Sequence, residues 1–405
     1  MMNIKGLLKA LLGVFFALLI VISGAFLYQE LKHSKDGQSW EFSLKPKNNS
    51  SKTSSARIFC NGDLLYHDIV YWSAEQGDGT YDFNNNFRYL KDWLDQGDLV
   101  IGDYEGTITP GRELTGYPMF NAPVEVASAI KNAGYDVMAL ANNHILDMGL
   151  EGVASTQKAF NDLGIDTIGV YTKAPRSTDQ LLIKEVNGIK IAILNYAYGY
   201  NGMEQNLSKK EYEASMSDLD EEKMKEEINF AEQNADITIV MPHMGIEYQL
   251  QPNEEQKALY HKMIDWGADL VFGGHPHVIQ PSEVVNHNGE NKFIIYSMGN
   301  FLSNQRIETV DNPWTERGVL MDVSLTKQGD TTKIETIQAH PTWVNRTPNG
   351  KRGHGFDLYD YTVYVLEDWV QGGKYYGQLD HATQARVDRA YQETLDHVNL
   401  QWPKE

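Results

Sequence analysis

The sequence is poor in cysteine, in positive charge and in long apolar runs. The 405 residues include one cysteine, Cys60, so the chain cannot form an intrachain disulfide. Cys60 lies in the apolar stretch ARIFC, where we expect a small buried side chain. The 35 Lys and Arg are outnumbered by 55 Asp and Glu, and the formal net charge of −20 would repel nucleic acid phosphates. We therefore expect no nucleic acid partner, although a bound metal would admit an anionic substrate.

One apolar run is long enough to span a bilayer. It is ALLGVFFALLIVISGAFLY, from Ala10 to Tyr28, and it carries no charge. A cleaved signal peptide is the alternative, but its apolar core is usually shorter. We predict a cytoplasmic segment over 1–9, a transmembrane anchor over 10–28 and a flexible linker rich in Ser, Lys and Asn over 29–56. We therefore expect a single-pass cell-membrane protein with its main domain outside the cell.

After residue 57, short apolar runs alternate with segments of helical periodicity. The helical patterns at 123–134, 151–164 and 253–267 each end in glycine, which favours a helix terminus. This alternation is typical of an α/β domain, which we expect over 57–345. The runs GVLMDVSL and KIETIQAH have no helix between them and should pair as a hairpin or edge, and residues 346–405 should form a helical extension. The predicted strands are 57–62, 98–104, 135–142, 190–197, 236–243, 269–275 and 292–299.

Polar residues follow five of these strands where each strand ends. Because ligands of open α/β sheets bind outside the carboxyl ends of the strands, we expect these residues to converge in one crevice. Taken singly, each cluster has a simpler explanation, such as a turn, a solvated loop or, for Asp147, an N-cap. Their joint occurrence favours a shared site. The clusters are Gly62–Asp63, Gly102–Glu105, Asn142–His144, His243 and Gly274–His277.

The residue types in these clusters suit a metal centre. Imidazole, carboxylate and amide oxygen are ligands for zinc, manganese or iron, and the absence of thiolate argues against a closed structural zinc site. Two divalent cations about 4 Å apart activate a bridging water for attack on a phosphoryl or carbonyl centre. An imidazole outside the coordination spheres would protonate the leaving group. We therefore expect two divalent metal ions as cofactors.

Six motifs follow one another along the chain: NGD ending at Asp63, GDYE ending at Glu105, ANNHILDMG at 141–149, HMGIEY at 243–248, GGHPHVIQ at 273–280 and YSMGNF at 296–301. In this order they resemble the poly-γ-glutamate capsule biosynthesis protein CapA family, which looks like a branch of the calcineurin-like metallophosphoesterases. The resemblance covers roughly residues 57–345 and implies a metallophosphoesterase-like αββα sandwich behind the N-terminal transmembrane helix.

The resemblance also implies roles for single residues. His144 would be the general acid, oriented by Asp147. Glu105 is favoured over Asp103 as the carboxylate that bridges the metals. The implied metal ligands are Asp63, Glu105, Asn143, His243, His275 and His277, with Asp103 and His67 as further possibilities.

The sequence departs from the superfamily pattern at two positions. The usual D-x-H motif has Leu65 in place of histidine, and His67 would replace it only if the loop turned back. The bridging position also carries a glutamate instead of the usual aspartate.

Three further residues are candidates for substrate binding, each with a structural alternative. Arg317 would otherwise form an ion pair, Asn300 would cap a turn, and Glu247 would form a salt bridge.

Two functions follow from these patterns. The first is a membrane-anchored, metal-dependent hydrolase that acts on phosphoester or amide bonds of an anionic surface polymer such as poly-γ-glutamate. The alternative is a non-catalytic subunit that binds polymer or partner proteins within a capsule synthesis and export complex. A secreted solute-binding protein is a third hypothesis, against which the anchor length and the number of histidines argue.

Overall fold

The computed structural model describes residues 53–403. The predicted anchor over 10–28 and nearly all of the predicted linker therefore lie outside the described residues. Within 53–403, no helix combines the length and the apolar character that crossing a bilayer requires. The first strand begins at Thr53, four residues before the predicted start of the folded domain.

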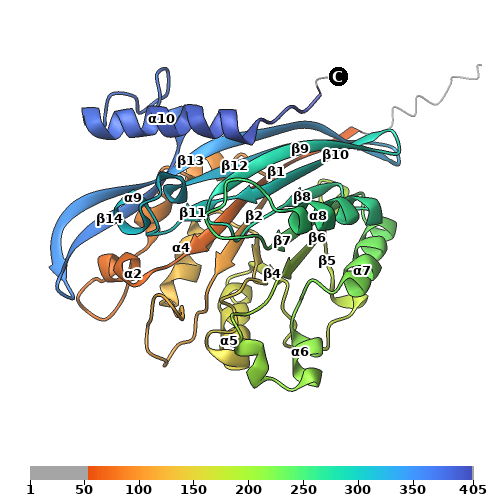
Figure 1. Cartoon of the computed structure of the whole chain (residues 1–405), viewed down its shortest axis with the longest axis horizontal. Helices are drawn as coiled ribbons and strands as arrows, with labels where there is room; N and C mark the ends of the chain where they lie inside the picture. The colour runs from red at the N-terminus through yellow and green to blue at the C-terminus, as the bar shows by residue number, and fades with distance from the viewer. Residues whose placement is uncertain (1–52, 404–405) are drawn as a thin grey trace, which may run out of the picture. The chain divides into compact units, whose positions relative to one another are not determined.

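Two β-sheets form the centre of the molecule (Figure 1). The eight-stranded sheet has the order β14-β13-β12-β1-β2-β3-β4, with β11 paired to β1, and the six-stranded sheet has the order β5-β6-β7-β8-β10-β9. The first sheet consists of β1 (Thr53–Leu65), β2 (Leu99–Glu105), β3 (Val137–Ala139), β4 (Asp166–Ile168), β11 (Asn300–Leu302), β12 (Arg317–Gln328), β13 (Thr331–Gly353) and β14 (Phe356–Val365). The second consists of β5 (Leu182–Val186), β6 (Ile189–Ala197), β7 (Ile237–His243), β8 (Leu270–Phe272), β9 (Ile279–His287) and β10 (Glu290–Met298).

The central strands of both sheets are parallel. Strands β1 to β4 pair in parallel, as do β6, β7, β8 and β10. Strands β12, β13 and β14 extend the first sheet in antiparallel order, so the hairpin predicted for GVLMDVSL and KIETIQAH is confirmed. Strand β13 crosses residue 345, and β14 follows it, so the first sheet continues into the segment where only helix was expected.

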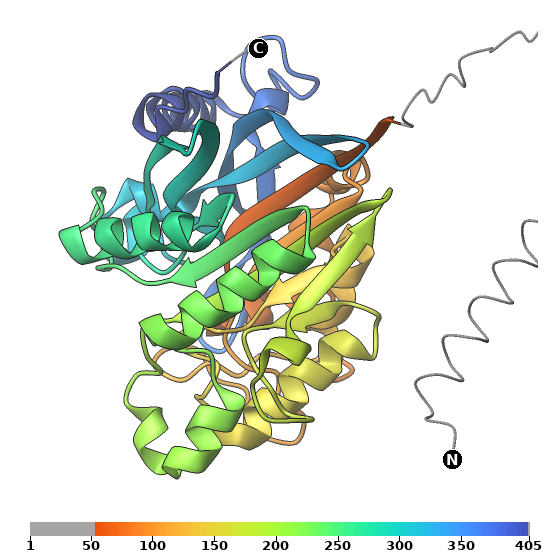
Figure 2. The same cartoon turned by 90° about the vertical axis from the view of Figure 1, so that its right-hand side faces the viewer.

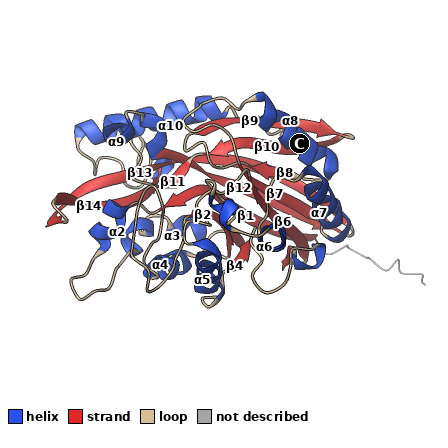
Figure 3. Ribbon diagram, turned by 60° about the horizontal axis from the view of Figure 1, so that its bottom comes forward, coloured by secondary structure: helices blue, strands red, loops and turns tan. Residues whose placement is uncertain are grey.

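The two sheets face each other across one apolar core, and helices cover their outer faces. Alternate residues of β6 show this directly, because Ile191 and Ile193 lie in the core between the sheets, whereas Ala192 and Leu194 pack against helices. Figure 3 shows the helices arranged around the strands. The predicted mixed α/β architecture with two sheets is therefore confirmed. The helices are α2 (Asp68–Ala74), α3 (Lys91–Leu94), α4 (Glu125–Ala133), α5 (Gly149–Asn161), α6 (Lys209–Ser215), α7 (Glu221–Asn234), α8 (Glu254–Trp266), α9 (Ile307–Val310) and α10 (His381–Val398).

Helices α4, α5 and α8 correspond to the three predicted helical patterns. Gly134 and Gly267 adopt left-handed conformations at the ends of α4 and α8, with φ of 112° and 119°, as the terminal glycines predict. The Asn253 side chain caps the start of α8 by accepting a hydrogen bond from the Gln256 backbone N–H. Cys60 is buried in the core between the sheets, as expected.

The C-terminal helix α10 contacts both sheets. Its residues Val387 and Ala390 pack with Trp343 of β13 in the first sheet. At its other end, the Val398 carbonyl accepts a hydrogen bond from the Ser282 hydroxyl of β9 in the second sheet. In Figures 1 and 2, α10 lies on the opposite side of the strands from α5 and α6. The helix therefore connects the layers along one side of the molecule.

Candidate metal centre

Residues from both sheets converge where the parallel strands end. Asp63 lies two residues before the end of β1, Glu105 ends β2, and Asn143 follows β3 in the same sheet. His243 ends β7 of the second sheet, and His275 and His277 follow β8. Two sets of buried side chains lie close enough to share a cation: Asp63, Glu105 and His277, and Asp63, Asp103 and His243.

A bulge in β1 directs Asp63 into the site. Pairing with β2 shifts between Cys60 and Asp63, so that Asp63 lies opposite Asp103. Gly62 permits this course, because a Cβ there would lie 2.1 Å from the Gly299 carbonyl oxygen. The Asp63 N–H donates to that same carbonyl. The carboxylate is fully buried.

Glu105 lies between two imidazoles. Its Oε1 is 3.8 Å from Nε2 of His277 and 3.9 Å from Nε2 of His243. Asp103 lies two residues earlier on the same face of β2, with Oδ2 3.3 Å from Nδ1 of His243. Glu105 therefore lies between the two imidazoles, whereas Asp63 is the carboxylate that both ligand sets share.

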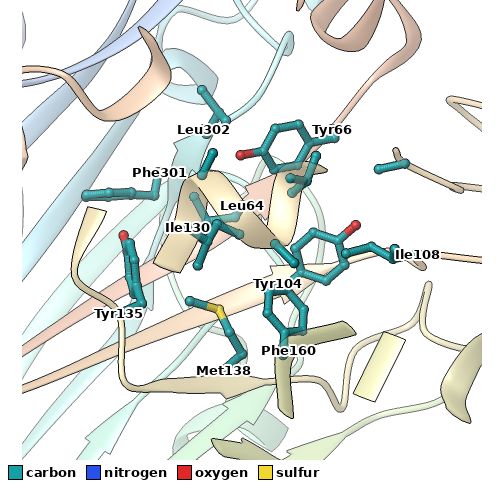
Figure 4. Close-up of a cluster of buried hydrophobic side chains, with 14 of the residues drawn as sticks. Leu64, Tyr66, Tyr104, Ile108, Ile130, Tyr135, Met138, Phe160, Phe301 and Leu302 are labelled. Carbon is teal, nitrogen blue, oxygen red and sulfur yellow. The ribbon is translucent and has the colours of Figure 1, made fainter. Parts of the chain in front are cut away.

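Tyr104 fixes the strand that carries both acids. Its side chain points to the opposite face of β2, into the cluster in Figure 4 that also contains Leu64, Tyr66 and Phe160. Its ring packs edge-to-face against Phe160 with the centroids 5.1 Å apart. Because successive strand residues alternate in direction, anchoring Tyr104 holds Asp103 and Glu105 toward the site.

The stretch 141–149 supplies one possible ligand and one possible acid. The Asn143 amide oxygen is 2.8 Å from Nε2 of His243. The next residue, His144, places Nδ1 2.7 Å from Oδ2 of Asp147, which also accepts a 2.6 Å hydrogen bond from the Phe120 backbone N–H. The alternative of Asp147 as a helix cap is wrong, because the N-cap of α5 is Met148 and Asp147 orients His144 instead.

His275 and His277 adopt backbone conformations that are rare for non-glycine residues. Their φ values are 94° and 56°. The His275 ring packs against the rings of His243 and of the half-exposed Tyr198, with centroids 5.1 Å and 4.6 Å away. Backbone strain of this kind is concentrated at functional sites, where the surroundings enforce it.

Six buried atoms at this place accept or donate no hydrogen bond. They are both carboxylate oxygens of Asp63, both of Glu105, Oδ1 of Asp103 and Nδ1 of His275. Buried polar atoms are nearly always paired, so such a concentration needs an explanation. All six are ordinary ligand atoms for divalent zinc, manganese or iron. The residues therefore fit a metal centre.

Electrostatics point the same way. Burial, with the neighbouring Asp63 and Glu105 charges, raises the pKa of Asp103 to about 6, although His243 opposes the rise. Burial also raises the pKa of Glu105. For His277, burial lowers the pKa, but Glu105 and Asp63 outweigh burial and raise the pKa to about 10. Crowded carboxylates repel one another, and a divalent cation would reverse this local balance.

His67 lies near the centre but belongs to neither ligand set found within 53–403. Its Nδ1 accepts a 3.3 Å hydrogen bond from the Asn304 backbone N–H, and its ring packs edge-to-face on Phe120. Burial and the nearby His277 lower the pKa of His67 to about 3. One nitrogen of His67 thus already accepts a hydrogen bond, and His67 does not visibly replace the metal-binding histidine that the superfamily has at the position of Leu65.

The three candidate substrate-binding residues have different surroundings. Arg317 takes the structural alternative, because its Nη1 donates to Glu393 of α10 at 2.7 Å and its guanidinium packs on Trp314. Asn300 is fully buried, so its amide contacts protein groups. Glu247 is exposed after β7, beside Tyr248, and its charge helps to raise the pKa of His277.

The sequence analysis placed Asn142 and Gly274 in the converging clusters but gave neither of them a role. The Asn142 amide donates to the Tyr104 carbonyl at 2.7 Å and its oxygen accepts from the His144 N–H at 3.1 Å, which joins β2 to the ANNH turn. Gly274 lies against the acids: a Cβ there would be 2.9 Å from Oδ1 of Asp63 and 3.0 Å from Oδ2 of Asp103. Both lie inside quoted motifs, but their partners are distant in sequence.

Replacing Gly274 with Ala should damage the centre without removing a ligand. The added methyl group would press on two buried carboxylates, and such overpacking costs about 1–3 kcal/mol. We expect a lower melting temperature and weaker manganese binding. Gly199→Ala is the control, since a Cβ there meets nothing within 4 Å. Wild-type stability and wild-type manganese affinity in Gly274→Ala would contradict the close packing.

Comparison with solved structures gives distant likenesses. One is a calcineurin-like phosphoesterase, YfkN from Bacillus subtilis, at 15% identity and a TM-score of 0.43, covering 86% of this chain and 100% of that one. Another is a phosphatase from Mycoplasma pneumoniae, at 18% identity and a TM-score of 0.42, covering 72% and 94%. At these TM-scores neither likeness bears on activity.

Sequence comparison gives nearer relatives and the family. The chain is 31% identical to the capsule biosynthesis protein CapA of Bacillus anthracis over 229 residues, which is 54% of each chain and so about half of that relative's length. It is 28% identical to the PGA biosynthesis protein CapA of Bacillus subtilis over 297 residues, 70% of this chain and 73% of the relative. The pattern that defines the bacterial capsule synthesis protein PGA_cap matches residues 57–305, more than half of the sequence. The protein therefore belongs to the bacterial capsule synthesis protein family.

Proposed function

We propose that this chain is a membrane-anchored hydrolase of the cell surface that uses two divalent cations to cleave phosphoester or amide bonds in a capsular polymer. One observation carries the proposal: six buried ligand atoms without hydrogen-bond partners gather where both sheets end. Structural carboxylates are normally paired when buried, so these atoms are better explained by a cation that they share.

The geometry suggests which residues would hold the cations. Asp63, Glu105 and His277 would hold one cation. The second set, Asp63, Asp103 and His243, would hold the other, with Asn143 and His275 beside His243 as further ligands. Glu105, 3.9 Å from His243, is the proposed bridge between the two. Manganese, zinc or iron suits these nitrogen and oxygen atoms. When bound, such a pair of cations supplies an activated water and stabilises negative charge on the scissile group.

His144 would handle the proton of the leaving group. Asp147 accepts two hydrogen bonds through Oδ2, so the His144 nitrogen that faces it, Nδ1, is the one that carries hydrogen. As a general acid the ring would be the imidazolium, with its second proton on Nε2, which would pass that proton to the leaving-group oxygen and return to the neutral form with hydrogen on Nδ1. The Phe120 ring packs edge-to-face on the imidazole at 4.7 Å and fixes its plane.

The family and the charge of the protein bear on which polymer it would act on. The names of the two CapA relatives refer to capsule or PGA biosynthesis, so an anionic polymer such as poly-γ-glutamate is the proposed substrate. With a net charge of −20, the protein would repel such a polymer except at the cations. We place the domain outside the cell, held by residues 10–28 beside other capsule synthesis subunits.

Removal of metal tests the proposal. The full-length chain, purified in detergent, should contain up to two equivalents of manganese, zinc or iron by elemental analysis. Its hydrolysis of a phosphodiester reporter should fall to background in chelator and return when one of these ions is added back. A protein that contains no metal and whose turnover ignores chelator would end the hydrolase proposal.

One observation favours the alternative of a non-catalytic capsule subunit. Leu65 occupies the usual histidine position, and the Nδ1 of His67 is taken by a backbone N–H. A host strain separates the two functions. If the alternative holds, His144→Ala leaves polymer production intact while deletion of residues 1–28 abolishes it. If the hydrolase proposal holds, His144→Ala stops production although the protein stays at the membrane.

A further inference from the structure

We propose that Asn300 is a positioning residue that selects which nitrogen of His277 faces the metal centre. The inference rests on the proposed function, since it concerns one of the residues expected to hold a cation. It assigns Nε2 of His277 as the ligand atom and Nδ1 as the nitrogen that carries hydrogen. The sequence had suggested only substrate binding or turn capping for Asn300.

Asn300 lies beside the centre because of the sheet. It begins β11, which pairs in parallel with β1 so that Asn300 is opposite Asp63. Its side chain is fully buried, so it cannot serve a substrate in solvent. Its Oδ1 is 3.0 Å from Nδ1 of His277. A strand of three residues thus places one amide directly behind one imidazole.

The surroundings determine which way the amide points. Its Nδ2 donates to the Thr315 carbonyl at 2.8 Å and to Oε1 of Gln305 at 3.0 Å, and it lies 3.3 Å from the His277 carbonyl. All three neighbours are acceptors, so the nitrogen of the amide must face them. The oxygen therefore faces His277.

The amide oxygen then fixes the state of the ring. An oxygen that only accepts requires hydrogen on Nδ1 of His277. Oδ2 of Asp63, 3.2 Å from the same nitrogen, favours that hydrogen through its charge, although it forms no hydrogen bond itself. A neutral imidazole with hydrogen on Nδ1 has its lone pair on Nε2, and Nε2 lies on the side of Glu105. A hydrogen bond behind a ligating histidine commonly fixes its tautomer in this way.

Asn300 is suited to this task because it is neutral. Were Asp63 the sole acceptor for His277, its carboxylate would have to serve the imidazole and a cation together. The Asn300 amide takes the hydrogen bond without adding a negative charge to a centre that already holds Asp63, Asp103 and Glu105. It also contacts the carbonyl of His277, whose left-handed backbone needs support.

The test compares zinc binding by the full-length chain and two variants. In Asn300→Ala we expect the zinc dissociation constant to rise about 10–100-fold, the usual loss when such a partner is removed. Asn86→Ala is the matched control, because Asn86 is also buried and donates to a carbonyl, that of Tyr361, outside the centre. Its zinc affinity should not change. Equal affinity in wild type and Asn300→Ala, or an equal loss in both variants, would refute the positioning role.

Nitrogen-15 NMR of the histidines in the zinc-loaded wild type supplies a readout that needs no variant. His277 should show hydrogen on Nδ1 and zinc on Nε2, and the opposite assignment would overturn the inference even if Asn300→Ala failed to fold. Wild-type protein that binds no zinc, manganese or iron would instead remove the proposed function and this inference with it. Wild-type binding together with zinc on Nδ1 would remove the inference alone.

Discussion

Glu105→Gln is expected to reduce hydrolysis of a phosphodiester reporter at least about 100-fold and to lower the metal content of the purified chain. Glutamine keeps the size of the side chain but removes the charge that lies between His243 and His277. Removing a residue that only hydrogen-bonds to a metal ligand commonly lowers metal affinity or activity about 10–100-fold. Removing the charge of a proposed ligand shared by both cations should lower them further. Elemental analysis and reporter turnover measure the two effects.

Glu227→Gln is a suitable control for that experiment. Glu227 is also buried, but its carboxylate pairs with Arg176 and accepts from the Tyr196 hydroxyl, away from the ligand sets. Breaking a buried ion pair should lower stability, whereas the metal content should remain at the wild-type level. If Glu105→Gln keeps its metal and its turnover, Glu105 does not bridge the centre and Asp103 becomes the candidate.

His144→Ala is expected to lower kcat about 10²–10⁴-fold for substrates with an alkyl leaving group, the usual contribution of a positioned general acid. The loss should be much smaller for a nitrophenyl leaving group, which departs without a proton. Metal content should not change, because His144 belongs to neither ligand set in the described part of the chain. Parallel assays of the two substrate types measure this difference.

The half-exposed His261, paired with Glu283, provides the histidine control, and His261→Ala should behave as wild type. Equal losses on both substrate types would show that His144 does not deliver a proton to the leaving group. A loss of metal in His144→Ala would show that it acts as a ligand or supports one.

The sequence predicted the central strands because their pattern is simple. Strands such as β6 and β7 are buried on both faces and appear as continuous apolar runs. Strand β9 was missed because IQPSEVVNH is a half-exposed edge with mixed polarity and a proline. Helix α7 was also missed, although Met224, Ile228 and Ala231 form an apolar face within an otherwise charged segment.

The sequence predicted which residues form the site better than it predicted how they are arranged. The motifs named the carboxylates and imidazoles, but Asp103 and Glu105 share one face of β2, so spacing alone could not assign the bridge. The positive charge of Arg317 suggested that it binds an anionic substrate. Its ion-pair partner Glu393 lies 76 residues later in the chain, so the sequence did not reveal the pair. Asn300 posed the same difficulty, since Thr315 and His277 become its neighbours only in the folded chain.

The contact of α10 with both sheets has a consequence for the distant cluster of ligands. Asp63 and Glu105 belong to one sheet and His243 to the other, so their separation depends on how the sheets are aligned. Helix α10 joins β13 to β9 and thereby opposes sliding between the layers. Deleting this helix from the carboxyl terminus would remove none of the coordinating side chains, but it would alter the distances between them.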